Sequence, residues 1–406
     1  MTVLGSLGTA ASHPLPSLND PLVSEPLVAA TNDEPGPHIE IVVVGPGDQF
    51  YSLYGHLAVL VWTDDNRNPR QGKLFNFGMT NFTEDGYFGD FVGGQVQFWG
   101  GQQSYAKYLR LWTKQDRSII RYPLNLKPDV ARAMYRQLQH DVMPANKYFL
   151  YDTFRNNCST RVRDIVDTYT RGAVYRALAT TPVEHSYRHD VRRAYSKRIA
   201  LLWLTEWYLG YTADQPRTAW ELSYRPIYFG EALTKIRHLN GSPLVGPPTL
   251  EHARGGPDPT AGWYHWLSTV LVGLSALLFF FGWRSVAWTL RRHAIMTLAV
   301  GVPLMALSIG HLSLQLASEW VDARNSLLLL AMCPIDLVVA IGFISSLKQT
   351  RPLSDTLRLY LRIRLFIATV VLMLGWVDFG AGPIAPRLMV VSWWFLAFRQ
   401  PKGVDQ

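Results

Sequence analysis

The chain has 406 residues, of which 48% are hydrophobic and 17% charged, and this apolar content exceeds what one soluble core of that length needs. Its formal net charge of +8 arises mostly after Trp263, where 12 Lys and Arg stand against 6 Asp and Glu. The part before Trp263 holds 27 against 25, a balance that argues against a basic surface able to follow a nucleic-acid backbone, so we exclude nucleic acid as a partner.

The N-terminal segment 1–37 has neither a basic start nor an apolar core of the length that a secretory signal needs. We expect this segment to be poorly structured. Export of the domain that follows then requires either a start site further upstream or translocation by the first membrane span.

Three strands are predicted from β-branched and aromatic runs at residues 39–44, 57–62 and 74–77. His56 stands at the start of the second strand, and Asn76 is the one amide of the third. Neighbouring antiparallel strands can hold two such side chains next to each other. We therefore expect His56 and Asn76 to meet.

A fourth strand is predicted around residues 118–124, and Pro128 opens a helix that runs to about Val142. Strands at close spacing, joined by turns and followed by helices, predict an α+β domain with an antiparallel sheet. We place this domain at residues 38–262.

Apolar residues recur at helical spacing from Val162 to Tyr169, which predicts a helix that begins near Asn157 with Cys158 in its first turn. The unpaired amides and positive dipole end of a helix favour a thiolate over a thiol and can hold a developing oxyanion. Cys158 is therefore placed as a nucleophile would be.

A nucleophile needs a base, and the base needs a group that orients it. Cys158, His56 and Asn76 are candidates for these three roles, although each also has a structural explanation: a small buried residue, a strand-edge imidazole, a solvated amide. Spacing alone leaves both interpretations open. The second cysteine, Cys333, lies in an apolar run, so we expect both thiols to be free.

Further candidates for substrate binding are the hydroxyls of Tyr51, Ser52 and Tyr54 and the amide of Asn157, with packing an equal explanation for the two tyrosines. The Gly-rich stretch 45–48 is a turn, because it contains a Pro and lacks the Lys-Ser/Thr of a nucleotide-binding loop. No cluster of metal ligands appears in the sequence. We expect neither a metal nor a cofactor.

Residues 263–406 contain five apolar segments, at 263–283, 294–317, 326–347, 365–377 and 388–398. They predict a bundle of about five transmembrane helices, of which the first three are the longest. Asp336 lies deep within the third segment, where a carboxylate lines a polar cavity or pairs with another helix.

Loop charges predict the orientation of this bundle, because Lys and Arg stay on the cytoplasmic side during insertion. Alternate loops carry ten Lys and Arg, whereas the loops between them carry only Arg324 and Arg387. The bias predicts a multi-pass protein of the bacterial inner membrane, with its C-terminus in the cytoplasm and its N-terminal domain in the periplasm.

Three blocks of the soluble part, at residues 45–56, 74–78 and 155–164, resemble the signature blocks of the Lnb N-terminal periplasmic domain family in order and spacing. The resemblance covers roughly residues 39–172, and several C-terminal membrane helices also occur in that family. The His-then-Cys order is similar, more distantly, to the permuted papain-like thiol-hydrolase fold of the lecithin:retinol acyltransferase type.

The resemblance implies a lipoprotein N-acyltransferase. Its acyl donor would be a membrane phospholipid or a neighbouring lipoprotein, and its acceptor the N-terminal amine of a bacterial lipoprotein. Cys158 would be the nucleophile that forms a thioester, and His56 the base. The orienting role of Asn76 is our inference from its strand position.

Two other functions remain open from the sequence. The same thiol machinery would serve a cell-wall amidase or peptidase. Alternatively, the chain is a non-enzymatic membrane adaptor in which the His–Cys pair has no catalytic role.

Overall fold

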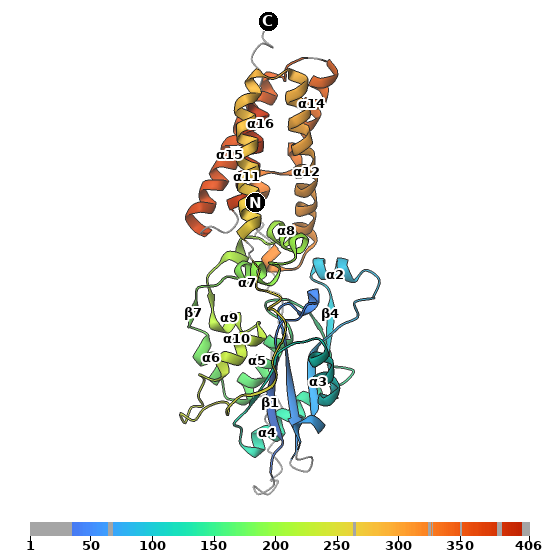
Figure 1. Cartoon of the computed structure of the whole chain (residues 1–406), viewed down its shortest axis with the longest axis vertical. Coiled ribbons are helices and arrows are strands. Elements are labelled where there is room, and N and C mark those ends of the chain that lie inside the picture. The colour runs from blue at the N-terminus through green and yellow to red at the C-terminus, as the bar shows by residue number, and fades with distance from the viewer. Residues whose placement is uncertain are drawn as a thin grey trace, which may run out of the picture. The chain divides into compact units, whose positions relative to one another are not determined.

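Figure 1 shows the computed structural model, which describes residues 35–63, 68–262, 265–323, 326, 328–349, 351–379 and 384–399. Most of the predicted N-terminal segment 1–37 lies outside the described residues. The chain forms two compact units. Unit 1 comprises Met1–Thr83, Gln97–Thr181 and Thr218–Gly256, and unit 2 comprises Glu84–Val96, Pro182–Arg217 and Pro257–Gln406.

Unit 1 is built on a seven-stranded sheet with the order β6-β4-β3-β2-β1-β5-β9, in which all paired neighbours are antiparallel. The strands are β1 (His38–Val44), β2 (His56–Trp62), β3 (Lys73–Met79), β4 (Gln97–Ser104), β5 (Ile119–Pro123), β6 (Tyr148–Leu150) and β9 (Thr249–His252). The four predicted strands are confirmed to within two residues, and the α+β class is confirmed with them.

Helices cover both faces of this sheet. In unit 1 they are α3 (Tyr105–Lys114), α4 (Pro128–Asp141), α5 (Cys158–Tyr169), α6 (Ala173–Leu178), α9 (Ala219–Leu222) and α10 (Pro226–Leu233), with the short turns η1 (Phe50–Ser52) and η3 (Pro69–Gln71). The predicted helix from Pro128 is confirmed as α4. The predicted helix start at Cys158 is confirmed as α5.

The two faces of the sheet follow from the alternation of side chains along each strand. Val42 and Leu74 point to the face covered by α3, where they share a core with Trp112. Val43 points the other way and closely approaches Gly230 of α10. Phe75 likewise meets Tyr135 of α4 edge to face, with ring centroids 5.9 Å apart.

Unit 2 contains the C-terminal helices together with two earlier stretches of chain. The earlier stretches hold α2 (Tyr87–Gly93), β7 (Pro182–Val183), α7 (Tyr187–Ala194), α8 (Ile199–Tyr208), η4 (Tyr211–Asp214) and β8 (Arg217–Thr218). The C-terminal part holds α11 (His265–Arg284), η5 (Ser285–Ala287), α12 (Leu290–Ala317), η6 (Val321–Ala323), α13 (Leu328–Ala331), η7 (Pro334–Asp336), α14 (Leu337–Gln349), α15 (Asp355–Phe379) and α16 (Ile384–Phe398).

The described parts of the five predicted apolar segments are mainly helical, although the third is divided between α13, η7 and α14. The prediction of about five spans is only partly confirmed. Two helical stretches of the described chain, Leu290–Ala317 and Leu329–Gln349, are long and apolar enough to cross a membrane. The apolar helices Thr269–Arg284 and Arg387–Phe398 are shorter. Helix α15 is long, but three arginines lie in its first half and lower its hydropathy.

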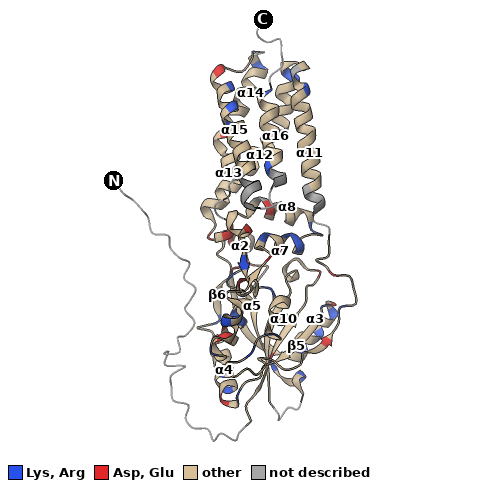
Figure 2. Cartoon of the chain, turned by 90° about the vertical axis from the view of Figure 1, so that its left-hand side faces the viewer, with Lys and Arg blue, Asp and Glu red and all other residues tan. Residues whose placement is uncertain are grey.

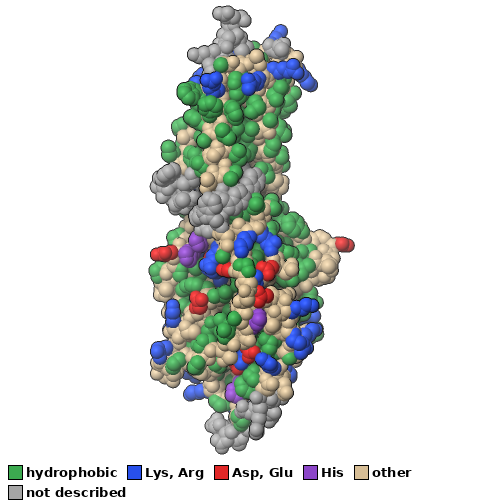
Figure 3. Space-filling model, viewed as in Figure 1, with side chains coloured by type: hydrophobic (Ala, Val, Ile, Leu, Met, Phe, Trp, Pro, Cys, Tyr) green, Lys and Arg blue, Asp and Glu red, His purple; other side chains and the backbone are tan. Residues whose placement is uncertain are grey.

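The outer surface of these helices is apolar. Large hydrophobic side chains are well exposed along them, including Trp283 (64%), Leu316 (80%) and Phe366 (69%). Figure 3 shows apolar side chains over much of the visible face of the bundle. A soluble protein rarely exposes so large an apolar surface, so lipid is its expected solvent.

Asp336 is fully buried among the helices of unit 2 and is paired there. Its Oδ2 accepts a hydrogen bond from Arg364 Nη2 at 2.6 Å, and its Oδ1 accepts one from the Tyr360 hydroxyl at 2.6 Å. Both partners belong to α15. Asp336 was predicted to line a polar cavity or to pair with another helix, and it pairs with α15. The two bonds offset the free-energy cost of burying its negative charge among apolar side chains.

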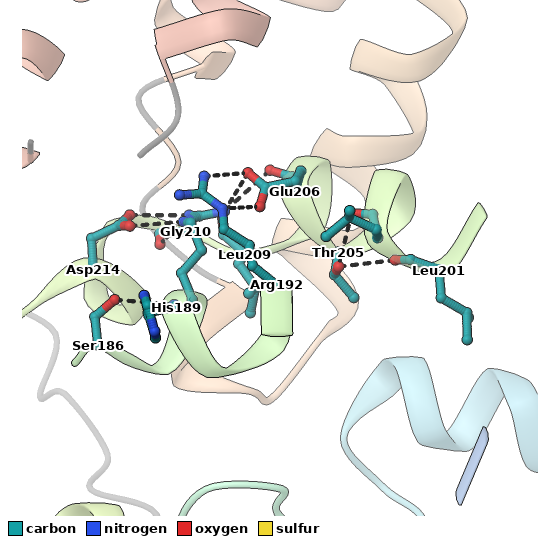
Figure 4. A network of polar contacts seen from close by, with 11 residues as sticks. Ser186, His189, Arg192, Leu201, Thr205, Glu206, Leu209, Gly210 and Asp214 are labelled. Atoms are coloured by element: carbon teal, nitrogen blue, oxygen red, sulfur yellow. Dashed lines mark hydrogen bonds and ion pairs between the residues drawn. The ribbon is translucent and has the colours of Figure 1, made fainter. Parts of the chain in front are cut away.

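A second buried network holds α7, α8 and η4 together (Figure 4). Arg188 donates from Nε to Asp214 at 2.8 Å and from Nη2 to the Leu209 carbonyl at 2.8 Å, while Arg192 forms an ion pair with Glu206. Burial alone raises the pKa of Glu206, but the charges of Arg192 and Arg188 outweigh it and hold that pKa below its ordinary value. The stabilisation from this ionised carboxylate is present at neutral pH and is lost on acidification through the lowered pKa.

We expect Arg188→Met to destabilise unit 2 strongly, because it leaves Asp214 buried without its guanidinium partner. Breaking a buried pair from one side costs about 3–5 kcal/mol, which calorimetric unfolding in detergent would record as a lower melting temperature. Arg193→Met removes an exposed charge from the same helix and should shift stability by less than about 0.5 kcal/mol. Equal melting temperatures for the two variants would contradict the assignment.

Candidate active site

The predicted meeting of His56 and Asn76 is confirmed. Ala58 of β2 lies opposite Asn76 of β3, and His56, two residues before Ala58, points to the same face of the sheet. The His56 Nε2 and Asn76 Oδ1 atoms are 2.8 Å apart.

The hydrogen bonds of Asn76 fix the tautomer of His56. The Gly78 backbone N–H donates to Asn76 Oδ1 at 2.8 Å, and Asn76 Nδ2 donates to the Tyr108 hydroxyl at 3.3 Å, so Oδ1 is an acceptor. His56 must then carry its proton on Nε2 and donate it to Asn76. The other ring nitrogen, Nδ1, keeps its lone pair and can accept a proton.

A glycine is required under the imidazole. A Cβ on Gly78 would lie 2.6 Å from His56 Cε1, which is closer than a Cβ can approach, and 3.2 Å from Nδ1, which is a tight contact. The ring of Trp112 lies 5.9 Å from that of His56 and helps to limit its movement. Gly78, Trp112 and Asn76 together hold the imidazole in one orientation.

Cys158 is the first residue of α5, and its position depends on the Asn157 cap. Asn157 Oδ1 accepts hydrogen bonds from the N–H groups of Ser159 (2.8 Å) and Thr160 (2.9 Å), while the Thr160 hydroxyl accepts one from the Asn157 N–H. This is a capping box, which satisfies donors that a helix start leaves unpaired.

The amide nitrogen of Asn157 is also used by the fold. Its Nδ2 donates to the carbonyls of Thr153 (2.9 Å) and Tyr224 (3.0 Å), which fastens the helix start to the loop before it and to the chain before α10. The proposed contact of Asn157 with substrate stays a prediction, since the structure assigns its side chain a capping role.

The thiol of Cys158 is neutral at rest. Its surface is partly exposed, yet burial raises its pKa to about 11, against the opposing effects of the Leu57 backbone N–H, the Arg117 charge and the Ser159 N–H. The opposing groups are those that would also stabilise negative charge at the sulfur or beside it.

His56 is neutral as well. Burial and, to a smaller extent, the charge of Arg117 lower its pKa to about 3, although the hydrogen bond to Asn76 opposes the shift. No hydrogen bond joins Cys158 Sγ to the His56 ring in the described chain. The resting pair is therefore a thiol and a neutral imidazole, and such pairs often tighten only when substrate binds.

The other predicted residues line the loop that leads into β2. Ser52 is buried and donates its hydroxyl proton to the Gln49 carbonyl at 2.7 Å, and the ring of Tyr54 packs 5.9 Å from that of Tyr224. Tyr51 is half-exposed and stacks on Phe82 at 5.0 Å, with Phe50 beside both. Substrate binding by Tyr51, Ser52 and Tyr54 stays a prediction.

Sequence analysis did not identify Arg117, which is buried and whose charge affects both Cys158 and His56. A lone arginine between a helix and a strand carries no motif, so only its burial in the folded chain reveals it. Within the described residues, no group of three or more His, Cys, Asp or Glu side chains is arranged to hold a metal ion.

Residues 28–196 match the family described as the Lnb N-terminal periplasmic domain, which confirms the resemblance of the sequence blocks. No curated protein and no solved structure matches the chain. The matched segment contains His56, Asn76 and Cys158. Together with two helices long enough to cross a membrane, the match indicates a membrane protein with an N-terminal periplasmic domain.

The neutral thiol predicts a particular pH dependence of alkylation. In a Cys333→Ser background, the rate at which iodoacetamide modifies Cys158 should rise about tenfold per pH unit from pH 7 towards the pKa of about 11, because only the thiolate reacts. Mass spectrometry of the labelled peptide measures this rate. A rate that is already constant below pH 8 would instead indicate a preformed thiolate–imidazolium pair.

Proposed function

We propose that this protein, whose residues 28–196 match the Lnb N-terminal periplasmic domain family, is a membrane-anchored thiol acyltransferase. Cys158 takes an acyl chain from a lipid ester as a thioester and passes it to an amine. The N-terminal amine of a bacterial lipoprotein is the acceptor that the family resemblance implies. The observation that carries the proposal is the unprotonated Nδ1 of His56, whose ring Asn76 orients. Leu57, the next residue of the same strand, directs its backbone N–H at the Cys158 sulfur.

The first half-reaction transfers the acyl group to sulfur. As Cys158 Sγ attacks the ester carbonyl carbon, His56 Nδ1 takes the thiol proton, and the carbonyl oxygen becomes an oxyanion. The backbone N–H groups of Leu57 and Ser159, which act on the Cys158 sulfur, would stabilise that charge. The C–O bond to the leaving alcohol then breaks, and His56 returns its proton to the alcohol oxygen.

The second half-reaction releases the acyl group to the amine. A neutral amine attacks the thioester carbonyl carbon, His56 Nδ1 takes a proton from the attacking nitrogen, and the C–S bond breaks. The sulfur leaves as a thiolate and regains its proton from His56. A neutral imidazole suits both steps, because it must accept a proton before it can donate one.

The membrane part supports this assignment, since an enzyme that uses a lipid ester must work at a bilayer. Lys and Arg gather at the end of the helix bundle at which α16 ends (Figure 2), and Arg284, Arg291 and Lys348 lie in terminal turns of α11, α12 and α14. We infer that this end faces the cytoplasm and that the protein passes the inner membrane several times. The permuted thiol-hydrolase arrangement belongs to the same proposal, because it accounts for a His strand that precedes a Cys helix.

The proposal is tested by Cys158→Ala in cells that lack the native protein. We expect lipoprotein N-terminal peptides to lose their N-acyl group, as measured by mass spectrometry, while the variant accumulates and melts as the wild type does. Cys333→Ala is the matched control and should restore acylation.

Normal acylation in the Cys158→Ala cells would overturn the proposal. A changed pattern of cell-wall fragments with unchanged lipoproteins would overturn it in favour of a thiol amidase.

A further inference from the structure

Arg117 lies inside unit 1, after α3 and two residues before β5. It is 4% exposed, and its Nε donates a hydrogen bond to the Gly45 carbonyl at 2.8 Å. Its side chain passes close to Gly47. A Cβ added to Gly47 would lie 3.0 Å from Arg117 Cδ and 2.7 Å from Ser52 Oγ. The turn at residues 45–48 thus lets the guanidinium pass close to the loop that leads to His56.

The guanidinium has no carboxylate partner in the described chain. Its Nη2 is buried without any hydrogen-bond partner. Arg121, four residues on, differs in this respect, because it is paired with Glu40 and Glu251. A buried charge without a counter-ion is unfavourable, and an anion bound at this place would supply the missing partner.

This place adjoins the Cys158 site. The charge of Arg117 favours the thiolate of Cys158, disfavours protonation of His56 and interacts with Tyr51. Burial itself lowers the pKa of Arg117 to about 10, and the guanidinium stays charged at neutral pH.

The neighbouring surface is apolar. Phe50 (56% exposed), Tyr51 (50%) and Phe82 (43%) form an aromatic cluster at the surface of unit 1, and Tyr51 is the member whose hydroxyl interacts with Arg117. A buried cation beside exposed aromatic rings suits an amphiphile with an anionic group and an apolar chain.

We propose that Arg117 forms an anion-binding subsite within the Cys158 site and that the group it binds is a phosphate of the acyl donor. Arginine presents several donors to phosphate oxygens, and the free Nη2 supplies at least one of them here. This inference rests on the proposed acyltransferase, but its test does not use acyl transfer.

The test compares the rates at which two alkylating agents of similar size modify Cys158 in a Cys333→Ser background. Iodoacetate is anionic, whereas iodoacetamide is neutral. We expect the iodoacetate to iodoacetamide rate ratio to exceed that of free glutathione in the same buffer. Arg117→Gln should lower the ratio about tenfold, since a unit charge a few ångströms away acts strongly in a partly buried site. Arg117→Lys should keep most of it.

Arg254→Gln is the control variant, because Arg254 carries a nearby charge that is already paired with Asp48. It should leave the ratio unchanged. The subsite is overturned if Arg117→Gln leaves the ratio unchanged, if Arg254→Gln lowers it equally, or if the wild-type ratio does not exceed that of glutathione. The last comparison needs no variant and holds even if Arg117→Gln does not fold.

Protection from iodoacetamide identifies the source of the phosphate. Short-chain phosphatidylglycerol should protect wild-type Cys158 at about tenfold lower concentration than diacylglycerol of the same chain length, and Arg117→Gln should remove this difference. Equal protection of the wild type by the two lipids would overturn the phosphate assignment.

Protection by inorganic phosphate alone supports the subsite with free phosphate as its ligand. Loss of acylation in Cys158→Ala with no effect of Arg117→Gln would overturn the subsite and leave the acyltransferase standing.

Discussion

The site depends on the side chain of Asn157, whose polar atoms are all bound within the protein. Its oxygen caps α5, and its nitrogen binds the carbonyls of Thr153 and Tyr224. These bonds fix the first turn of α5, and with it Cys158, in relation to the loop before the helix and to the chain before α10. Asn76 does the same for His56 through one amide whose oxygen binds both the imidazole and the Gly78 N–H. Two asparagines thus position the nucleophile and the base.

Burial determines the charge state of the pair. It disfavours both a thiolate and an imidazolium, so Cys158 and His56 share no ion pair at rest and the proton must move during the reaction. The one charge that burial has not neutralised is that of Arg117, which has no carboxylate partner in the described chain. A resting site with one buried cation and no counter-ion is prepared for an anionic substrate, which is the electrostatic basis of the subsite that we propose.

Local patterns in the sequence predicted much of this arrangement. β-Branched runs identified the central strands, helical spacing after Cys158 identified α5, and the strand positions of His56 and Asn76 were sufficient to predict their contact. Arg117 was missed, because its importance comes from contacts with Gly45 and Gly47, some 70 residues earlier in the chain. Substrate binding by Asn157 stays a prediction, and the bond from its Nδ2 to the Tyr224 carbonyl cannot be read from local sequence. The number of spans was uncertain for a similar reason, as Arg364 is accommodated by long-range bonds to Asp336 and to the Leu330 carbonyl.

The central claim is that Cys158 carries the acyl group, and trapping the thioester tests it most directly. The purified protein would be incubated with phospholipid vesicles in the absence of an amine acceptor and examined by intact-protein and peptide mass spectrometry. The account predicts the added mass of one acyl chain on Cys158, removed by neutral hydroxylamine. No adduct, an adduct on another residue, or one that resists hydroxylamine would contradict it.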